Sequence, residues 1–348
     1  RINRLVIDPS DENLWYACAP SGGLWHSVDA GGHWEVLGVD VLAPLGATDV
    51  WVDPNDSDHL WLATGDGNGG DTYSIGVLET WDAGMTWNPL ELAFEPDQGR
   101  RIHAITPHPS DPMTLLVSTD LGVFKTNNGG TTFDLTLTGL TRDAIWLNDT
   151  AVVAAVEGQG IHKSTDGGNT WSPRTLPDAS GMGRIQIAAE AIEPGGSRDT
   201  LYAIAGQFFQ QNFLAFWRST DGGETWEAQI TRITGPNLLG YTLNGADNAG
   251  QAFWDLCIEV DPEDANRVLT GGVNVWETLD GGVTWNCPIH WQGALEAKYA
   301  HADQHDIVFT STGEVVLAND GGVFVWDGNV AEDRSLGLDI TQGYAIAL

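Results

Sequence analysis

The segment Ser164-Thr165-Asp166-Gly167-Gly168-Asn169-Thr170-Trp171 is one of six copies of a short pattern, and this repetition decides the fold. The pattern reads Ser/Thr-x-Asp-x-Gly-x-Thr-Trp, and we call it the box. Its central acid or amide is Asp29, Asp82, Asn128, Asp166, Asp221 or Asp280. Successive central positions are 53, 46, 38, 55 and 59 residues apart. This spacing is the length of a four-stranded sheet with variable loops, which is the repeating unit of a β-propeller.

Each box has the residues of a tight hairpin. A short alternating strand precedes it, as in Gly160-Ile-His-Lys163. The glycines after the central acid supply the positive φ angles of the turn, and the carboxylate accepts backbone N–H groups within it. The closing aromatic residue, such as Trp171, begins the next strand and packs between neighbouring units. We therefore expect the six central residues to be structural.

A second repeat runs in phase with the first. Turn sequences such as Asp8-Pro9 and Asp261-Pro262 lie between two apolar strands, and equivalent turns begin at Asp53, His108 and Glu193. Proline cannot continue a strand ladder, so each unit is strand A, turn, strand B, loop, strand C, box turn and strand D. The sequence thus predicts one all-β domain over 1–348, a propeller of four-stranded antiparallel blades. The blades are expected at roughly 1–40, 41–92, 99–138, 143–176, 183–230, 252–290 and 301–338, with 339–348 as the first strand of a further or closing blade.

Charge and composition exclude several classes of partner. The formal net charge is −33, which disfavours binding to nucleic acid or to anionic membrane surfaces. No apolar run is long enough to insert into a bilayer. The three cysteines have no metal-ligand spacing, and Cys257 with Cys287 is the most plausible disulfide pair. We expect the native chain to continue into further domains, because 343–348 resemble another strand A.

Loop lengths indicate which face of the propeller binds ligands. The distance from the A–B turn to the box is 21, 29, 20, 28 and 19 residues in five units, so Gly65–Ser74 and Gly206–Phe213 contain insertions between strands B and C. B–C loops and D–A connections share one face of a propeller, here the loop face; A–B and box turns share the other, the turn face. Binding is expected on the loop face. The candidate ligand-binding residues are Asp66, Asn68, Asp71, Tyr73, Phe208, Phe209, Asn212, Tyr241, Trp291 and Tyr299.

A candidate metal site begins the seventh blade. His301, Asp303 and His305 alternate along a predicted inner strand, so their side chains should project together into the channel mouth. Two imidazoles and a carboxylate suit a divalent cation such as zinc or calcium, and they equally suit a hydrogen-bonded channel lining. The segment from Asp66 to Asp71 begins like a calcium loop but has no downstream Glu, which favours a flexible glycine-rich loop tip.

The box pattern resembles that of the Asp-box, or bacterial neuraminidase repeat, superfamily of propellers. This group includes sialidases, xyloglucanase-type glycoside hydrolases, sortilin-type receptors and photosystem II assembly factors. The most similar members are secreted bacterial proteins described as glycosyl-hydrolase-like or sortilin-like. They have segments similar to Ala63–Gly70, His301–His305 and Asn319–Val323. The resemblance implies a secreted or cell-surface protein.

Two functions remain open after this resemblance. The preferred one is a non-catalytic scaffold that binds a glycan or an extracellular protein or peptide. The alternative is a glycoside hydrolase, which needs two carboxylates across a cleft, and Asp66, Asp255, Asp303 and Glu296 are the candidates. A sialidase is disfavoured, because no Arg-Ile-Pro signature occurs and the chain is acidic. The xyloglucanase-type signature Asp-Ile/Val-Gly-Gly, expected in both halves, is not matched, and Asp120-Leu-Gly-Val123 is the nearest approach to it.

Overall fold

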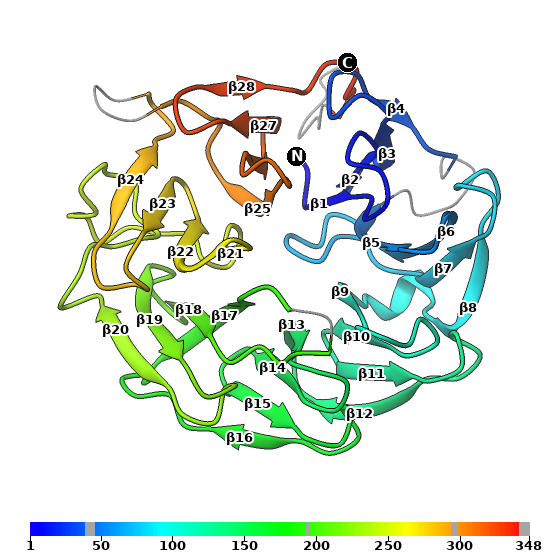
Figure 1. Cartoon of the computed structure of the whole chain (residues 1–348), viewed down its shortest axis with the longest axis horizontal. Coiled ribbons are helices and arrows are strands. Elements are labelled where there is room, and N and C mark those ends of the chain that lie inside the picture. The colour runs from blue at the N-terminus through cyan, green and yellow to red at the C-terminus, as the bar shows by residue number, and fades with distance from the viewer. Residues whose placement is uncertain (39–45, 193–194, 294–297, 341–348) are drawn as a thin grey trace.

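The computed structural model describes residues 1–38, 46–192, 195–293 and 298–340. Within these residues, seven four-stranded antiparallel sheets surround a central channel (Figure 1), which confirms the predicted propeller. The first strand of each sheet lines the channel, and the others follow outward in chain order. The described part of the chain has one helical turn, η2 (Pro96–Gln98), and no helix long and apolar enough to cross a membrane.

The strands have the following bounds. Blade 1 contains β1 (Arg4–Ile7), β2 (Trp15–Ala19), β3 (Gly23–Ser27) and β4 (Glu35–Val36), and blade 2 contains β5 (Ala47–Asp53), β6 (Asp56–Thr64), β7 (Gly76–Thr80) and β8 (Asn88–Ala93). Blade 3 contains β9 (Ile102–Pro107), β10 (Leu115–Thr119), β11 (Gly122–Thr126) and β12 (Asp134–Thr138), and blade 4 contains β13 (Thr141–Trp146), β14 (Val152–Val156), β15 (Gly160–Ser164) and β16 (Ser172–Arg174). Blade 5 contains β17 (Met182–Ala189), β18 (Leu201–Gln207), β19 (Phe213–Ser219) and β20 (Glu227–Thr231). Blade 6 contains β21 (Cys257–Asp261), β22 (Asp264–Gly271), β23 (Val275–Thr278) and β24 (Asn286–Ile289), and blade 7 contains β25 (Gln304–Phe309), β26 (Val315–Asn319), β27 (Gly322–Trp326) and β28 (Ala331–Asp333).

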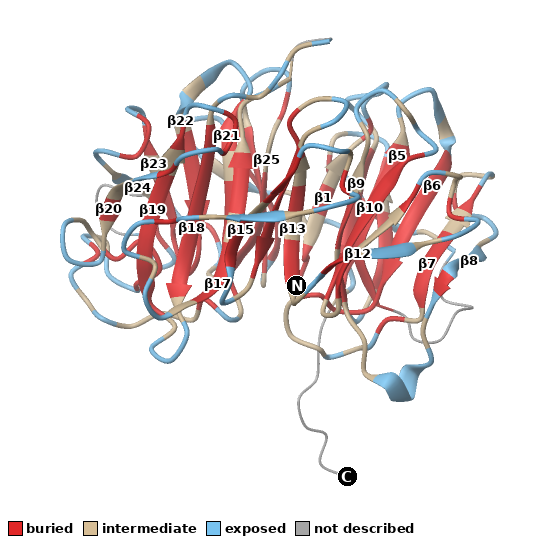
Figure 2. Cartoon of the chain, turned by 90° about the horizontal axis from the view of Figure 1, so that it is seen from below, coloured by how far each residue is buried: buried red, intermediate tan, exposed pale blue. Residues whose placement is uncertain are grey.

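The hydrophobic core lies between the blades. Each main cluster of buried side chains joins two neighbouring sheets, and second strands such as β14 and β26 are buried along their whole length; Figure 2 shows the buried residues concentrated in the strands. Between blades 4 and 5, for example, Trp217 and the box residue Trp226 pack against Val153 and Ile161. Burial of apolar area at about 25 cal/mol per Å² makes this packing the main source of stability. The box aromatics therefore have the packing role that the sequence predicts.

The first and seventh blades adjoin. Ile2 and Leu5 pack in one cluster with residues of β26 and β27. The backbone N–H of Ile2 donates to the carbonyl oxygen of Asn319 at 3.1 Å, and that of Leu5 donates to Asp306 at 2.9 Å. The further strand expected at 343–348 lies outside the described residues.

The box turns repeat one hydrogen-bond pattern. In blade 4, Oδ1 of Asp166 accepts the hydroxyl of Ser164 at 2.7 Å and the backbone N–H of Thr170 at 2.9 Å. Its Oδ2 accepts the Thr170 hydroxyl at 2.7 Å. Asp221 and Asp280 make the same three bonds. The carboxylate thus closes the turn, as the sequence predicts.

We expect Asn128→Asp to stabilise the protein. In this degenerate box the amide must donate to the Thr132 hydroxyl, at 2.9 Å, whereas the carboxylates of the other boxes accept. A charged acceptor strengthens such bonds, so a gain of about 0.5 kcal/mol is expected at pH 7. Because side-chain and backbone hydrogen bonds lower the pKa of a box carboxyl such as Asp82, the gain is present above the unfolded pKa and lost as the pH falls below it. Thermal unfolding at pH 7 and pH 3 checks this, and an equal gain at both pH values would contradict it.

All three cysteines are free, so the disulfide between Cys257 and Cys287 that the sequence left open is not formed. Cys257 belongs to β21, the innermost strand of blade 6, whereas Cys287 belongs to β24, its outermost strand. The two intervening strands hold the thiols apart, and their spacing along the chain did not reveal this.

Candidate functional site

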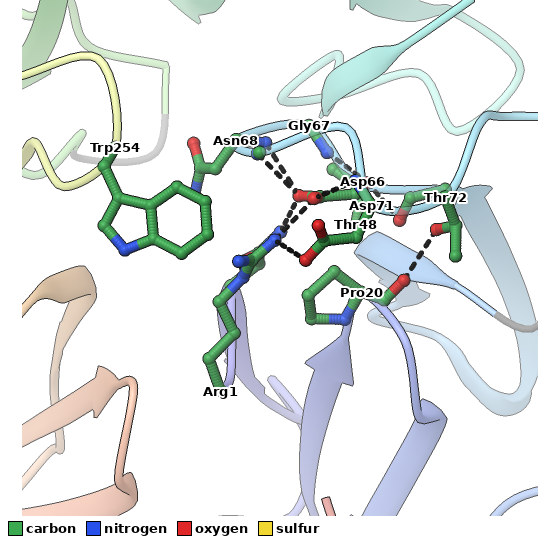
Figure 3. Close-up of polar contacts among 12 residues, drawn as sticks. Arg1, Pro20, Thr48, Asp66, Gly67, Asn68, Asp71, Thr72 and Trp254 are labelled. Carbon is green, nitrogen blue, oxygen red and sulfur yellow. Dashed lines mark hydrogen bonds and ion pairs between the residues drawn. The ribbon is translucent and has the colours of Figure 1, made fainter. Parts of the chain in front are cut away.

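The glycine-rich connection between β6 and β7 enters the centre of the ring (Figures 1 and 3). Asp66, near its start, has no exposed surface and pairs with the guanidinium of Arg1. Burial opposes the charge of this carboxylate, yet Arg1 and backbone N–H groups lower its pKa to about 2. Its other hydrogen-bond donors are the side chain of Asn3 at 3.0 Å and the backbone N–H groups of Asn68, Gly69 and Asp71 at 3.0, 3.0 and 2.8 Å.

This connection bridges several blades. The guanidinium of Arg142, in blade 4, donates to the carbonyl oxygen of Gly67 at 2.9 Å. Arg184, in blade 5, donates to Oδ1 of Asn68 at 2.9 Å, while the amide nitrogen of Asn68 lies 3.2 Å from Nδ1 of His305 in blade 7. The connection is thus a structural plug at the loop-face end of the channel, not the flexible tip expected from its glycines. We call residues 65–72 the plug.

Two of the predicted carboxylates meet on the loop face. Asp255 precedes β21 and is 1% exposed, and Asp303 precedes β25. The amide of Gln251 donates to Oδ2 of Asp255 at 3.0 Å, and the carboxylate of Asp303 is near enough to Asp255 for the two charges to repel each other. Burial raises the pKa of both carboxyls, and their mutual repulsion raises that of Asp255 further. Both carboxyls therefore favour their protonated forms more than ordinary carboxyls do.

A third carboxylate, Asp320, has the opposite environment. It lies in the turn between β26 and β27, with its side chain 26% exposed, and its Oδ1 is 2.7 Å from Nε2 of His305. Burial opposes ionisation, but the hydrogen bond from His305 and nearby positive charge lower the pKa of Asp320. Its negative charge in turn raises the pKa of Asp303. The site thus places a proton-holding pair beside an ionised carboxylate.

Exposed aromatic rings lie in the same connections of blades 5 to 7. Tyr241, Trp291 and Tyr299 are 39%, 37% and 51% exposed. The Tyr241 hydroxyl donates to Oε1 of Gln251 at 3.3 Å, and the Trp291 indole donates to the backbone oxygen of Tyr241 at 3.2 Å. Gln251 therefore links the aromatic residues to the carboxylate pair. These three aromatics are among the ligand-binding residues predicted from the sequence.

The other predicted ligand-binding residues differ in their exposure to solvent. Phe208 and Phe209 are exposed at the β18–β19 hairpin tip, and Tyr73 is exposed beside the plug. Asn212, in contrast, is buried and donates to the backbone oxygen of Asn248 at 3.0 Å. The predicted long loop of blade 5 is a hairpin, because its additional residues extend β18 and β19 and bury Phe213 in the core.

The predicted metal site does not form. β25 begins at Gln304, so His301 and Asp303 precede the strand and do not alternate with His305 along it. Asp303 has a φ of 65°, which turns the chain, and His301 is exposed. His305 is buried between Asn68 and Asp320. In the described part of the chain, no group of three or more His, Cys, Asp or Glu side chains is arranged to hold a metal ion.

The sequence-based candidates included only part of this site. Asp66 is enclosed in the plug and cannot reach a ligand, while Glu296 lies outside the described residues. Sequence reasoning missed Asp320 and Gln251. A signal for Asp320 was present, because Asn319–Val323 was one of the segments that carried the family resemblance, but its acid was not singled out.

No family model matches the chain. Among curated proteins, a xyloglucanase from Paenibacillus sp. is 24% identical over 254 residues, which cover 66% of this chain and 21% of that enzyme. A xyloglucanase from Hypocrea jecorina is 20% identical, with 86% of this chain and 40% of that enzyme covered. The chain thus spans less than half the length of the curated relatives that it matches.

Solved structures share the fold. The GH74 xyloglucanase from Xanthomonas campestris superposes with a TM-score of 0.66 at 17% identity, covering 93% of this chain and 51% of that one. YCF48 bound to D1 peptide gives 0.60 at 16% identity, covering 93% and 90%. The extracellular domain of BT4673 from B. thetaiotaomicron gives 0.62 at 12% identity, covering 93% and 38%. The chain is therefore a seven-bladed propeller similar to xyloglucanases and to propellers with other roles.

Proposed function

We propose that this chain is a glycan-directed propeller of the glycoside hydrolase type, which binds a β-glucan such as xyloglucan across its loop face. The observation that carries the proposal is the arrangement of the Asp255–Asp303 pair, the ionised Asp320 and exposed aromatic rings on that face. The curated xyloglucanases that the chain resembles support this substrate class.

In this proposal the carboxylate pair is the general acid. Burial raises the pKa values of both Asp255 and Asp303, and the charge of a neighbouring carboxylate raises each further, Asp303 for Asp255 and Asp320 for Asp303, so both favour the protonated form. Asp303 is the more exposed member and would donate its proton to the departing glycosidic oxygen as the bond to the anomeric carbon breaks. A water molecule would then bond to that carbon, and its released proton would restore the acid form. Gln251 orients Asp255 through its 3.0 Å hydrogen bond and acts as a positioning residue. A carboxylic acid that stays protonated near neutral pH is what protonation of a leaving group requires.

Asp320 supplies the complementary negative charge. Its hydrogen bond to His305 keeps it ionised, and the charge of an anion stabilises the positive charge that develops on the sugar ring. Asn68 contacts the other ring nitrogen of His305, so the plug fixes the imidazole that orients Asp320. When the surroundings raise the pKa of one carboxyl and lower that of another, the first is assigned as the acid and the second as the ionised partner.

The aromatic residues would hold the sugar rings. Tyr241 and Trp291 are partly exposed and fixed by hydrogen bonds, so their faces are available without a large loss of side-chain freedom. A neutral polysaccharide also suits a chain with a net charge of −33, because it brings no negative charge to the surface. A polymeric substrate implies a secreted or cell-surface protein, because a polysaccharide does not cross a membrane.

The proposal is tested with the purified chain on xyloglucan, mixed-linkage β-glucan and carboxymethyl cellulose. Native electrophoresis in gels containing each polymer measures binding, and release of reducing ends measures hydrolysis. We expect retardation and new reducing ends with at least one β-glucan. Binding without turnover would assign the non-catalytic glycan scaffold instead. If none of the three polymers retarded the protein, both the hydrolase and the glycan-scaffold proposals would be overturned.

A paired substitution locates the binding face. Trp291→Ala is expected to weaken the affinity for the polymer, as measured from retardation, about tenfold. This is the effect of losing about 1.4 kcal/mol of stacking and burial. The matched control is Trp81→Ala, which removes an indole that is 61% exposed on the turn face. Equal losses in the two variants would argue against the loop face as the glycan site.

A further inference from the structure

The channel is open at the turn face. A chamber of about 750 Å³ lies there, rimmed by A–B turn residues such as Pro9 and Pro54 and by the rings of Trp51 and Phe309. It leads to an inner chamber of about 230 Å³, because Arg4, Arg198, Glu259 and Asp306 line both. The plug closes the opposite end, so a ligand can enter the two chambers from the turn face.

Three carboxyls, Asp143, Glu259 and Asp306, line the inner chamber together with Arg4, Arg198 and His305, and Asp49 belongs to the outer chamber. Asp49 and Asp306 each contact the guanidinium of Arg4 at 3.3 Å, so their charges are partly compensated. Asp143 and Glu259 line the same chamber, and neither forms an ion pair with any described residue. Burial raises the pKa of Asp143 to about 7 and that of Glu259 to about 8. These two buried carboxyls therefore have no ionic partner among the described residues of the chamber, and a cation bound beside them would favour their ionised forms.

Unpartnered polar atoms lie in the same chamber. Oε1 of Gln186 is shielded from solvent and has no hydrogen-bond donor among the described residues. Nε of Arg198 is likewise buried without an acceptor. Buried polar groups are normally paired, so an orphan acceptor and an orphan donor in one cavity indicate a ligand with both kinds of group. Gln186 with Asp143 and Glu259 offers three acceptor side chains, the number of N–H groups on an ammonium.

A groove continues from the chamber across the turn face. Its volume is about 470 Å³, and it shares Trp51, Pro54, Pro107 and Arg198 with the chamber. Its far end is lined by Trp146 and by prolines of the third A–B turn. Aromatic and proline side chains form shallow apolar surfaces that hold extended peptides. The cavity system is therefore longer than a single side chain.

We propose that the turn face binds an extended basic peptide segment of a partner protein, with a lysine side chain inserted into the channel and the adjoining backbone along the groove to Trp146. Asp143 and Glu259, which form no ion pair with a described residue, and the unpartnered oxygen of Gln186 together favour a cation, and the described residues offer no cluster able to hold a metal ion. The continuous groove favours a peptide over a free diamine. This site lies on the face opposite the glycan site and is independent of it.

The test uses a ten-residue proline-rich peptide with one central lysine, and its counterpart with norleucine there. Calorimetric titration should show binding of the lysine peptide and at least tenfold weaker binding of the norleucine peptide. Glu259→Gln combined with Asp143→Asn should abolish the difference. The matched control is Glu263→Gln, an exposed acid of a turn-face turn outside the cavities. Equal affinities of the two peptides for the wild-type protein would overturn the proposal.

Two further measurements separate the possible sources of the cation. Cadaverine that binds as tightly as the lysine peptide would overturn the assignment to a peptide, because the groove would then contribute nothing.

Affinity for the lysine peptide should rise about tenfold from pH 6 to pH 8.5, because the carboxyls must lose protons to pair with the ammonium. An affinity that does not change with pH would contradict the placement of the lysine ammonium beside Asp143 and Glu259. The charged and titratable groups around Asp143 and Glu259 are Arg4, Arg198, Asp49, Asp306, Cys257 and His305.

Discussion

Asp66→Ala is expected to lower the free energy of unfolding by about 3–5 kcal/mol, the usual cost of removing one partner of a buried ion pair. The substitution removes the buried carboxylate that pairs with Arg1 and leaves this guanidinium with the more exposed Asp71, at 3.3 Å, as its remaining ionic partner. It also removes the acceptor of the Asn3 side chain and of three backbone N–H groups in the plug. Urea unfolding followed by tryptophan fluorescence measures the loss.

The pH dependence identifies the carboxylate as the cause. The folded pKa of Asp66, about 2, is below the unfolded value of about 3.9, so its stabilisation is present above pH 4 and lost as the pH falls towards 2. The difference between wild type and variant should therefore shrink over this interval. Glu227→Ala, at an exposed position of β20, is the control and should change stability by less than about 0.5 kcal/mol. A small effect of Asp66→Ala at pH 7 would mean that the plug does not depend on this ion pair.

The blades could be predicted because their signals are local. A box such as Ser164–Trp171 contains its own turn glycines, its own hydrogen-bond acceptor and its own core aromatic, so eight residues specify one hairpin. Proline turns mark the other end of each blade. Repetition then gives the ring, since every blade must cover the apolar faces of its neighbours.

The plug could not be predicted because its partners come from distant blades. Its glycines indicate a mobile tip when only sequence neighbours are considered. In the structure, Arg142 and Arg184 are 75 and 116 residues from the plug atoms to which they donate. These buried arginines fix a segment whose composition by itself favours flexibility. No regular spacing in the sequence relates the arginines to Asp66.

The candidate site was predicted in part for the same reason. Tyr241, Trp291, Asp255 and Asp303 were recognised as polar or aromatic residues in long connections, but not as a group, because the connections belong to different blades. The spacing of His301, Asp303 and His305 predicts alternation along a strand, but the strand begins only at Gln304. The left-handed backbone at Asp303 breaks the alternation, and the true start of β25 at Gln304 turns His305 towards the plug.

Asp303→Asn is expected to lower kcat/KM on xyloglucan by about 10³-fold, equivalent to about 4 kcal/mol of transition-state stabilisation. The loss should be much smaller on a dinitrophenyl glycoside, whose leaving group needs no proton. Asp320→Asn should reduce activity on both substrates, because the developing charge on the sugar is the same. Asp97→Asn, an exposed carboxylate in η2 on the loop face, is the control and should leave activity unchanged. Equal losses on both substrates for Asp303→Asn would exclude it as the acid.

The pH–rate profile separates the two roles further. The raised pKa of the Asp255–Asp303 pair means that the acid form persists until the pH rises through that pKa, which sets the alkaline limb. The lowered pKa of Asp320 sets the acidic limb. Because the charge of Asp320 raises the pKa of Asp303, residual activity of Asp320→Asn should have its alkaline limb at lower pH than the wild type. An unshifted limb would mean that the two carboxylates do not interact, and would leave the pair without the ionised partner that the mechanism requires.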